Sequence, residues 1–255
     1  MTSVLIGHTG FVGSNLARSH DFDLRVNSGS IGTLRGGTFD TIVCAGVSAV
    51  KWKANRDPEA DAAGIARLTE VLETVRAAQM ILVSTVDVLR DPAGADEATP
   101  AGTEGLHPYG LHRLQLEGWM ADRFPVTRVL RLPALFGPGL RKNIIYDLQT
   151  GNMPGAINPA SRFQWYPVTR LWQDIGTMIR ADLDLLHLAT EPVRTDTILR
   201  RFFPGAAVGT DPAPVAEYDF RTRHAEIFGA TGPYMMRGEE VMEALGAYLA
   251  AERTA

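Results

Sequence analysis

The chain has 255 residues and a mass of 27.7 kDa, which suits one large α/β domain, alone or with a small appendage, better than two full domains. Hydrophobic residues make up 45% and charged residues 21%, ordinary values that argue against a disordered, collagen-like or disulfide-framework protein. The formal net charge of -4 leaves no general basic field, and we find no local basic patch that would bind nucleic acid.

The sequence indicates a cytoplasmic protein in a reducing compartment. The single cysteine, Cys44, cannot form an internal disulfide, and its apolar neighbours predict a buried strand thiol. The first apolar run, residues 4–7, is far too short for a signal segment or a membrane span. The histidines and the cysteine nowhere show a metal-ligand spacing, so we expect no metal site and no membrane partner.

The first half of the chain alternates short β-branched runs with helical patterns, which is typical of βα units stacked into a parallel sheet. Residues 90–106, rich in Pro, Gly and acidic residues, are expected to form an exposed loop. Strands are predicted at 3–7, 23–27, 39–46, 80–85 and 126–137, and helices at 12–19, at 57–78 and from Tyr109 onward.

A glycine motif, GHTGFVG at 7–13, lies between the first predicted strand and the first predicted helix. Glycines there let the backbone approach a pyrophosphate, and the following helix N-terminus presents N–H groups and partial positive charge to it. The motif therefore predicts nucleotide binding, with a simple tight turn as the alternative. The candidate contacts are Gly7, Thr9, Gly10, Phe11, Val12 and Gly13.

The fold class that these patterns predict is α/β, with a Rossmann-like doubly wound parallel sheet and a small, discontinuous C-terminal substrate lobe. Residues 1–140 would form the dinucleotide-binding domain, which a strand near 182–190 would rejoin. Most of 141–255 would form the lobe, because the alternation of strands and helices breaks after Pro138.

Four further segments, together with the glycine motif, resemble the extended short-chain dehydrogenase/reductase family, in its sugar-nucleotide epimerase/dehydratase branch. The resemblance spans about the first 140 residues and implies cofactor contacts at Ala45, Gly46 and Pro133. It also implies a nucleotide-sugar substrate and a possible homodimer that pairs through the tyrosine helix. The matching segments are AGVSA (45–49) with Asp57-Pro58, VSTVDV (83–88), PYGLHR (108–113) and LRLPALFGPG (130–139).

The second predicted strand ends in Asn27-Ser28, where an NAD site usually has an acidic residue that binds the ribose 2′-hydroxyl. Without a carboxylate there to repel a 2′-phosphate, and with Arg25 or Arg35 close by in the sequence, NADP is slightly favoured over NAD.

By the same resemblance, Tyr109 is the acid/base group, Thr85 shares the substrate oxygen's proton, and Arg113 stands where the family has lysine. Tyr109 and Arg113 share a helix face, and a phenol with a pKa of about 10 needs a nearby cation to act near neutral pH. Arginine is not equivalent to lysine. Either this chain, with three lysines among 25 basic residues, uses arginine in a working site, or the site binds without turnover.

The substrate residues are less specific. Asp87 stands where dehydratases of the family have a glutamate, but Val86 replaces its partner acid, which argues against a dehydratase. Lys142 and Asn143 follow the Gly-Pro motif, and Gln164 lies in an aromatic run that suits a sugar-binding wall or plain core packing. Arg223 is a candidate for an anionic ligand.

The sequence therefore predicts an NAD(P)-dependent oxidoreductase or epimerase that acts on a nucleotide-linked sugar or related polyol by tyrosine-assisted hydride transfer. The alternative is a catalytically impaired protein of the same fold that binds a dinucleotide as a sensor or regulator.

Overall fold

The computed structural model describes residues 2–254, which form two compact units. The first unit contains the residues up to Asp91 together with Glu97–Arg131 and Trp172–His187, and the second contains Pro92–Asp96, Leu132–Leu171 and the residues from Leu188 onward. Strand β6 (Ala134–Phe136), which the expected boundary at residue 140 assigns to the first domain, pairs with β8 (Trp165–Pro167) in a separate two-stranded sheet.

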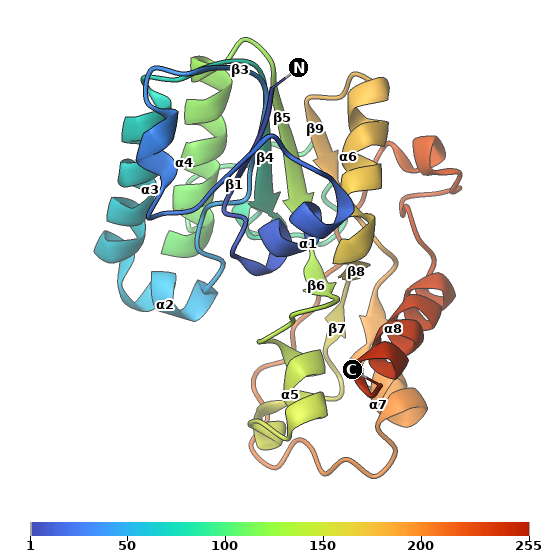
Figure 1. Ribbon diagram of the computed structural model, residues 1–255. Helices are drawn as coiled ribbons and strands as arrows, with labels where there is room; N and C mark the ends of the chain where they lie inside the picture. The colour runs from blue at the N-terminus through green and yellow to red at the C-terminus, as the bar shows by residue number, and fades with distance from the viewer. Residues whose placement is uncertain (1, 255) are drawn as a thin grey trace. The chain divides into compact units, whose positions relative to one another are not determined.

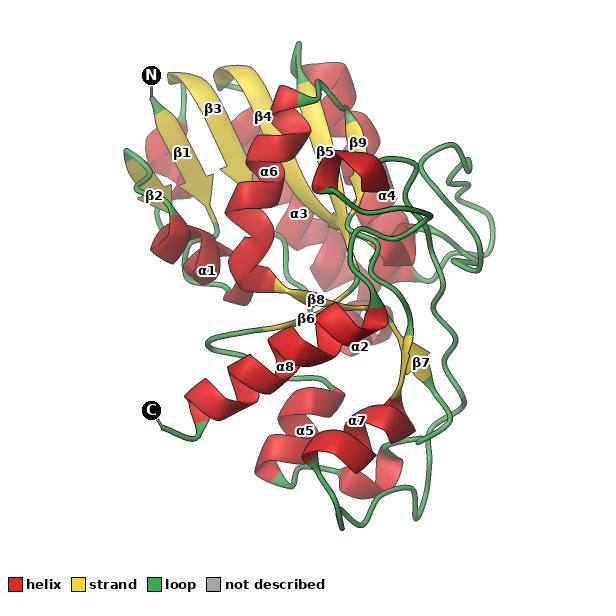
Figure 2. Cartoon of the chain, turned by 90° about the vertical axis from the view of Figure 1, so that its right-hand side faces the viewer, coloured by secondary structure: helices red, strands yellow, loops and turns green. Residues whose placement is uncertain are grey.

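The first unit is built on a six-stranded sheet with the order β2-β1-β3-β4-β5-β9. Helices α3 (Pro58–Leu72) and α4 (Pro108–Arg123) cover one face, and α1 (Phe11–Ser19) and α6 (Leu171–Arg180) cover the other (Figures 1 and 2). This arrangement confirms the expected doubly wound fold class. The strands are β1 (Ser3–Ile6), β2 (Leu24–Val26), β3 (Thr38–Cys44), β4 (Arg76–Thr85), β5 (Thr127–Leu132) and β9 (Leu185–His187).

The order of the strands places a topological switch point at β1. Strand β1 pairs in parallel with β2 on one side and with β3 on the other. The connection after β1 leads to β2, whereas the connection after β3 leads the opposite way along the sheet, to β4. Ligands of open α/β sheets bind at the carboxyl ends of the strands beside such a point. Residues 27–37, which connect β2 to β3, contain only a short 3-10 helix (Ile31–Leu34), and β2 is the edge strand.

The core of the first unit lies between the sheet and its helices. Because helices cover both faces, the central strands are apolar almost throughout, and residues such as Val4, Ile42 and Met80 are fully buried. Cys44 is buried at the end of β3, as expected, and burial raises the pKa of its thiol to about 11. This thiol is therefore protonated and unreactive at neutral pH.

Two expected elements differ from the structure. The predicted helix 57–78 ends at Leu72, because residues from Arg76 onward pair with β3 from Thr38 onward. The predicted strand 126–137 is broken at Pro133, which lacks a backbone N–H, and the residues after it enter the other sheet. The segment expected to return to the main sheet forms β9, which pairs in parallel with β5.

A buried polar network ties α4 to the sheet. Glu117 on α4 is 7% exposed and accepts hydrogen bonds from Arg131 on β5, the shortest 2.7 Å, and from the hydroxyl of Ser84 on β4. Nη1 of Arg131 also lies 3.4 Å from Nε2 of His187 on β9. Burying the ion pair of Glu117 and Arg131 costs desolvation energy on folding, so either charge would be strongly destabilising if its partner were removed.

The second unit contains the β6-β8 pair, an antiparallel pair of β7 (Arg162–Phe163) and β10 (Val193–Arg194), and three α-helices. These are α5 (Ile144–Thr150), α7 (Thr195–Phe202) and α8 (Gly238–Glu252). None of the helices in residues 2–254 is both long and apolar enough to cross a membrane.

Replacing Arg131 with Leu leaves the buried Glu117 without a partner, so the free energy of unfolding should fall by about 3 kcal/mol. Urea unfolding followed by circular dichroism measures this loss. The double variant Arg131→Leu, Glu117→Leu should regain much of it, because no buried charge remains. Arg25→Leu, which breaks an exposed pair with Asp21, should leave the unfolding midpoint nearly unchanged. Equal midpoints for Arg131→Leu and the wild type would contradict this account.

Candidate active site

The glycine motif forms a tight turn between β1 and α1, and two of its glycines are required by packing. Gly7 has a φ of +88°, and a Cβ there would lie 2.4 Å from the carbonyl oxygen of Ala45. A Cβ on Gly13 would lie 2.1 Å from the carbonyl oxygen of Gly7. At Gly10, by contrast, the nearest atom would be 3.4 Å away, and the residue is exposed. Gly10 therefore leaves backbone open to a ligand.

The N-terminus of α1 is suited to an anion. Its N-cap residue is Gly10, which supplies no side-chain cap, and its first turn has no acidic residue. In the same loop, Nδ1 of His8 is buried and makes no hydrogen bond to the residues that the structure describes. Uncapped N–H groups, the helix dipole and a closely approachable backbone fit the pyrophosphate of a dinucleotide. Thr9 precedes α1 and is exposed, whereas Phe11 and Val12 are the first two residues of the helix and are half-buried.

The residues after β2 carry no carboxylate, but the nearby cations are already paired. Oδ1 of Asn27 accepts hydrogen bonds within its own turn, from Gly29 N at 2.9 Å, and Ser28 is exposed. Arg25 pairs with Asp21 at 2.9 Å, and Arg35 pairs with Glu70 at 2.7 Å. Each arginine that would attract a 2′-phosphate thus shares its charge with a carboxylate.

The Tyr109 side chain lies beside Thr85, at the carboxyl end of β4. Helix α4 begins at Pro108, where Nδ1 of His107 accepts a hydrogen bond from Gly110 N at 3.0 Å. Oδ1 of Asn55 accepts from the backbone N–H of Tyr109, also at 3.0 Å. These caps fix the first turn of the helix, and the phenol, 8% exposed, lies near enough to Thr85 for that hydroxyl to act on its pKa.

Several groups act on the ionisation of Tyr109. Burial raises the pKa of its phenol above the usual value of 10, and the carboxylate of Asp87 raises it further. Arg113, the hydroxyl of Thr85 and Lys51 act in the opposite direction, and the net shift is upward. Without a ligand, Tyr109 is therefore a proton donor at neutral pH.

Arg113 is held by this chain's own acceptors. It is 4% exposed, and its two terminal nitrogens form a bidentate pair with Asp61, at 2.5 and 2.8 Å. The same nitrogens donate to the backbone oxygens of Tyr109 at 3.1 Å and Ser48 at 2.6 Å. All four terminal N–H bonds are thus used, and the guanidinium carbon lies 3.9 Å from the centre of the Tyr109 ring. These contacts hold Arg113 against the tyrosine, and the catalytic and cofactor-binding roles predicted for Arg113 stay predictions.

Asp61 is a residue that the sequence analysis missed. Burial raises the pKa of its carboxyl, but hydrogen bonds from Arg113 and His112 outweigh this effect and hold the pKa below the usual value. Its position in the first turn of α3 suggests only a helix-dipole contact. Nothing in the sequence indicates that it pairs with a residue so much later in the chain. His112, which lies 2.8 Å from Asp61, belongs to the same cluster.

Lys51 is the second missed residue. It begins α2 (Lys51–Arg56), and its ammonium lies 2.7 Å from Oδ1 of Asp87. Asp87, expected to contact substrate, therefore stands in an ion pair beside Tyr109. Ala45 and Gly46, the other expected cofactor contacts, follow β3 at the switch point, and Gly46 is exposed.

Two of the expected substrate residues in the second unit have structural roles. Gln164 is 1% exposed, and its amide bonds the backbone of Thr190 and Phe220, so the sugar-wall hypothesis is wrong for this side chain. Asn143 caps α5 through Oδ1 and donates to Leu135 O at 2.8 Å, which leaves little of its amide for a ligand. The exposed Lys142 and Arg223 stay candidates, and Pro133 falls on the second unit's side of the boundary.

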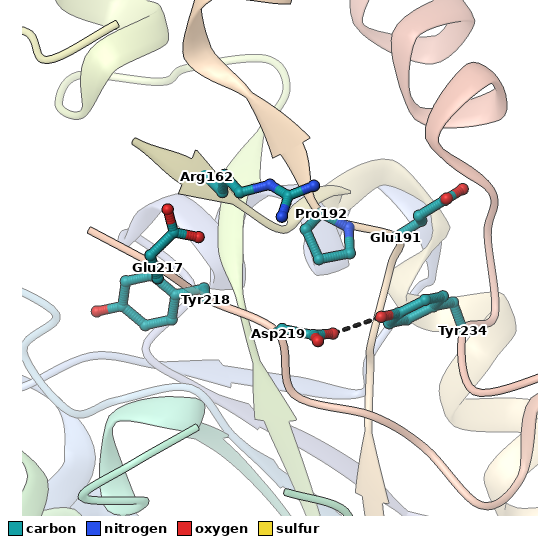
Figure 3. Close-up of a pocket in the computed structure, with 7 residues that line it drawn as sticks. All are labelled: Arg162, Glu191, Pro192, Glu217, Tyr218, Asp219 and Tyr234. Carbon is teal, nitrogen blue, oxygen red and sulfur yellow. Dashed lines mark hydrogen bonds between the residues drawn. The ribbon is translucent and has the colours of Figure 1, made fainter. Parts of the chain in front are cut away.

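The second unit also contains a pocket of about 140 Å³ that the sequence analysis did not anticipate (Figure 3). Asp219 accepts a hydrogen bond from the hydroxyl of Tyr234 at its wall, and burial with this contact raises the pKa of Tyr234 to about 12. Ligand pockets usually measure roughly 300 Å³ or more, so this cavity is too small for a nucleotide sugar. Within residues 2–254 no group of three His, Cys, Asp or Glu side chains could hold a metal ion.

Residues 7–13, together with Ala45 and Gly46, form a glycine cradle at the switch point of the sheet. The fold with this cradle defines a Rossmann-like α/β protein. The sequence matches no family model and no protein of curated function. Solved structures match the whole fold. They include MoeE5 in complex with UDP-glucuronic acid and NAD, at 16% identity and a TM-score of 0.74 over 100% of both chains. The UDP-glucose 4-epimerase of Thermotoga maritima with UDP-glucose has 14% identity and a TM-score of 0.74 over 99% of both. TunA, an NAD-dependent NDP-hexosamine 5,6-dehydratase, has 17% identity and a TM-score of 0.74 over 98% of both.

Replacing Asp61 with Asn leaves Arg113 buried without a carboxylate and should cost about 3 kcal/mol of stability at pH 7. Because the folded pKa of Asp61 lies below its unfolded value of about 3.9, the carboxylate stabilises the protein above pH 4 and loses this effect as the pH falls through the folded pKa. The difference in the free energy of unfolding between the wild type and Asp61→Asn should therefore become smaller below pH 4. Urea unfolding at pH 7, 5 and 3 tests this, with Asp21→Asn as the exposed control. A gap that is independent of pH would contradict it.

Proposed function

We propose that this chain is an NAD-dependent epimerase or reductase of the extended short-chain dehydrogenase/reductase type that acts on a nucleotide-linked sugar. The observation that carries the proposal is the buried Tyr109 phenol at the carboxyl end of β4, near enough to Thr85 for the Thr85 hydroxyl to lower the pKa of the phenol. Tyr109 and Thr85 lie in the same unit as the glycine cradle. The similar MoeE5 structures support it, because they are complexes with NAD and either UDP-glucuronic acid or UDP-glucose.

In this proposal the cradle binds the cofactor. Gly10 and the N-terminus of α1 would hold the pyrophosphate, and Ala45 and Gly46 would lie along the dinucleotide. A bound nicotinamide would supply a hydride acceptor or donor. We propose NAD over the NADP that the sequence favours, since Arg25 and Arg35 are both paired with carboxylates.

Tyr109 and Thr85 would handle the proton. When a carbonyl is reduced, the phenol of Tyr109 donates its proton to the carbonyl oxygen as hydride reaches the carbon. When an alcohol is oxidised, the phenolate takes the hydroxyl proton as hydride leaves the same carbon. Thr85 orients the reacting oxygen by a hydrogen bond. The raised pKa of Tyr109 favours its role as an acid in the first case.

The alternative is a protein of the same fold that binds the dinucleotide as a sensor or regulator. The observation that favours it is the commitment of all terminal N–H bonds of Arg113 to Asp61 and backbone oxygens. Titration of the purified protein with NAD, NADH and NADPH, followed by incubation with UDP-glucose, UDP-galactose and UDP-glucuronic acid, distinguishes the two. Saturable binding without any turnover supports the sensor, and no binding at all contradicts both.

Replacing Tyr109 with Phe should lower turnover by about 100-fold or more, because the proton donor is lost. The affinity for NAD should stay within about twofold of wild type, as measured by isothermal titration calorimetry, because the pyrophosphate contacts lie elsewhere. Tyr234→Phe, in the separate pocket of the second unit, is the matched control and should leave turnover unchanged. Full activity in Tyr109→Phe would contradict the proposed mechanism.

A further inference from the structure

Asn27 follows directly on the residue of β2 that contacts the glycine cradle. Strand β2 is the edge strand of the sheet and pairs with β1, which leads into the cradle (Figure 2). The backbone N–H of Gly7 donates to the carbonyl oxygen of Val26 at 2.7 Å, and the N–H of His8 donates to the same oxygen at 3.4 Å. In dinucleotide-binding folds a carboxylate about 20 residues after the glycine motif binds the 2′-hydroxyl of the adenosine ribose. Here an amide stands in the place of that carboxylate.

Hydrogen bonds within one turn hold Asn27 in a single orientation. Its backbone N–H donates to the hydroxyl of Ser30 at 3.0 Å, and its backbone oxygen accepts from Ser30 N at 3.0 Å and Ile31 N at 2.8 Å. Its side-chain Oδ1 accepts from Gly29 N at 2.9 Å, which closes an Asx-turn. A backbone N–H can donate only to the oxygen of an amide, so this bond fixes which side of the amide Nδ2 occupies.

The N–H bonds of this amide are available to a ligand. Nδ2 of Asn27 makes no hydrogen bond to the residues that the structure describes, and the residue is half-buried. An amide nitrogen is a donor only, so it can donate to a ribose hydroxyl or to an oxygen of a 2′-phosphate. A carboxylate in its place would accept from the hydroxyl but repel the phosphate.

The charges around this turn are balanced. Arg25 on β2 pairs with Asp21 at 2.9 Å, and Arg35, in the connection from β2 to β3, pairs with Glu70 at 2.7 Å. Asp23 precedes β2 and so lies at the opposite end of the strand from the turn. With each of the two guanidinium groups matched by a carboxylate, these pairs add no net charge that would strongly favour one form of the dinucleotide.

We propose that Asn27 reads the 2′ position of the adenosine ribose through its Nδ2 donors, so that the site binds NAD and NADP with affinities that differ by less than about tenfold. The preference for NAD is then small, because Arg25 and Arg35 are paired and no carboxylate follows β2. This inference rests on the proposed function in taking the glycine cradle as the dinucleotide site, and it names Asn27 as the residue that determines cofactor specificity there.

Asn27→Asp tests this role because it changes the charge and keeps the turn. A carboxylate can accept from Gly29 N as the amide does, and circular dichroism checks that the fold is intact. Isothermal titration calorimetry with NAD and with NADP gives the two affinities. Asn27→Asp should bind NADP about 100-fold more weakly than the wild type, because the new carboxylate repels the 2′-phosphate. Its affinity for NAD should stay within about threefold, because a carboxylate accepts a hydrogen bond from the ribose hydroxyl.

Gln115→Glu is the matched control, since it makes the same change from amide to carboxylate at an exposed position of α4. It should leave both affinities unchanged, which separates a charge beside the ribose from a change in net charge. Raising the salt concentration should reduce the loss of NADP affinity caused by Asn27→Asp, because salt screens the repulsion between the carboxylate and the phosphate.

NMR of the asparagine side-chain amides reports the contact in the wild type. The Nδ2 resonance of Asn27 is identified by its absence in Asn27→Asp. Addition of NAD or of NADP should shift this resonance, because both bring an oxygen acceptor to the amide. Nicotinamide mononucleotide, which lacks the adenosine half of the dinucleotide, should not shift it.

The outcomes separate this inference from the proposed function. If the two wild-type affinities differ by more than about tenfold, or if Asn27→Asp binds NADP as tightly as the wild type does, the inference is overturned and the proposed function stands. If Asn27→Asp loses NADP as expected but the wild type turns over no nucleotide sugar, the proposed reaction fails and the role of Asn27 stands. If the wild type binds neither dinucleotide, both are overturned.

Discussion

The buried pair of Asp61 and Arg113 is the contact on which the geometry of the site depends. It joins α3 to α4, and through the backbone oxygen of Ser48 it also holds the loop that follows β3. The guanidinium lies over the ring of Tyr109, so the same side chain sets the position of the phenol. Removing two charges from water is costly, and the cost is offset only because every terminal N–H bond of Arg113 finds an acceptor.

Arginine at position 113 suits the task of fixing the tyrosine ring. Its planar fork matches a carboxylate at two points, and the Asp61 and Arg113 side chains are both almost fully buried. Lys51, a second cation at the site, comes from α2, is 39% exposed and pairs with Asp87. The departure from lysine at position 113 is thus matched by a carboxylate on α3 that pairs with the arginine.

Local signals were sufficient for the first unit of the fold. The apolar runs from Val4 to Thr85 are bounded by glycines and polar residues, and their burial on both faces follows from an almost continuous apolar pattern. The sequence pattern predicts a helix that continues to residue 78, because the apolar period runs through Val75, but the pairing of β4 with β3 ends the helix at Leu72. The pairing of Asp61 with Arg113 joins residues far apart in the sequence, so no local pattern predicts it. The same is true of the hydrogen bond that Gln164 accepts from the backbone N–H of Phe220.

The two buried ion pairs together explain how α4 is held in register. Tyr109, Arg113 and Glu117 are four residues apart, so they form one stripe along the buried face of the helix. Apolar packing by Leu116 and Met120 on that face would tolerate small slides along the sheet, because dispersion contacts have little direction. Asp61 pairs with Arg113, and Glu117 pairs with Arg131 one turn further along α4. Each contact is lost if the helix slides by a fraction of a turn. The two ion pairs thus fix the position of α4 more than they stabilise the fold, and this position of α4 places Tyr109 near Thr85.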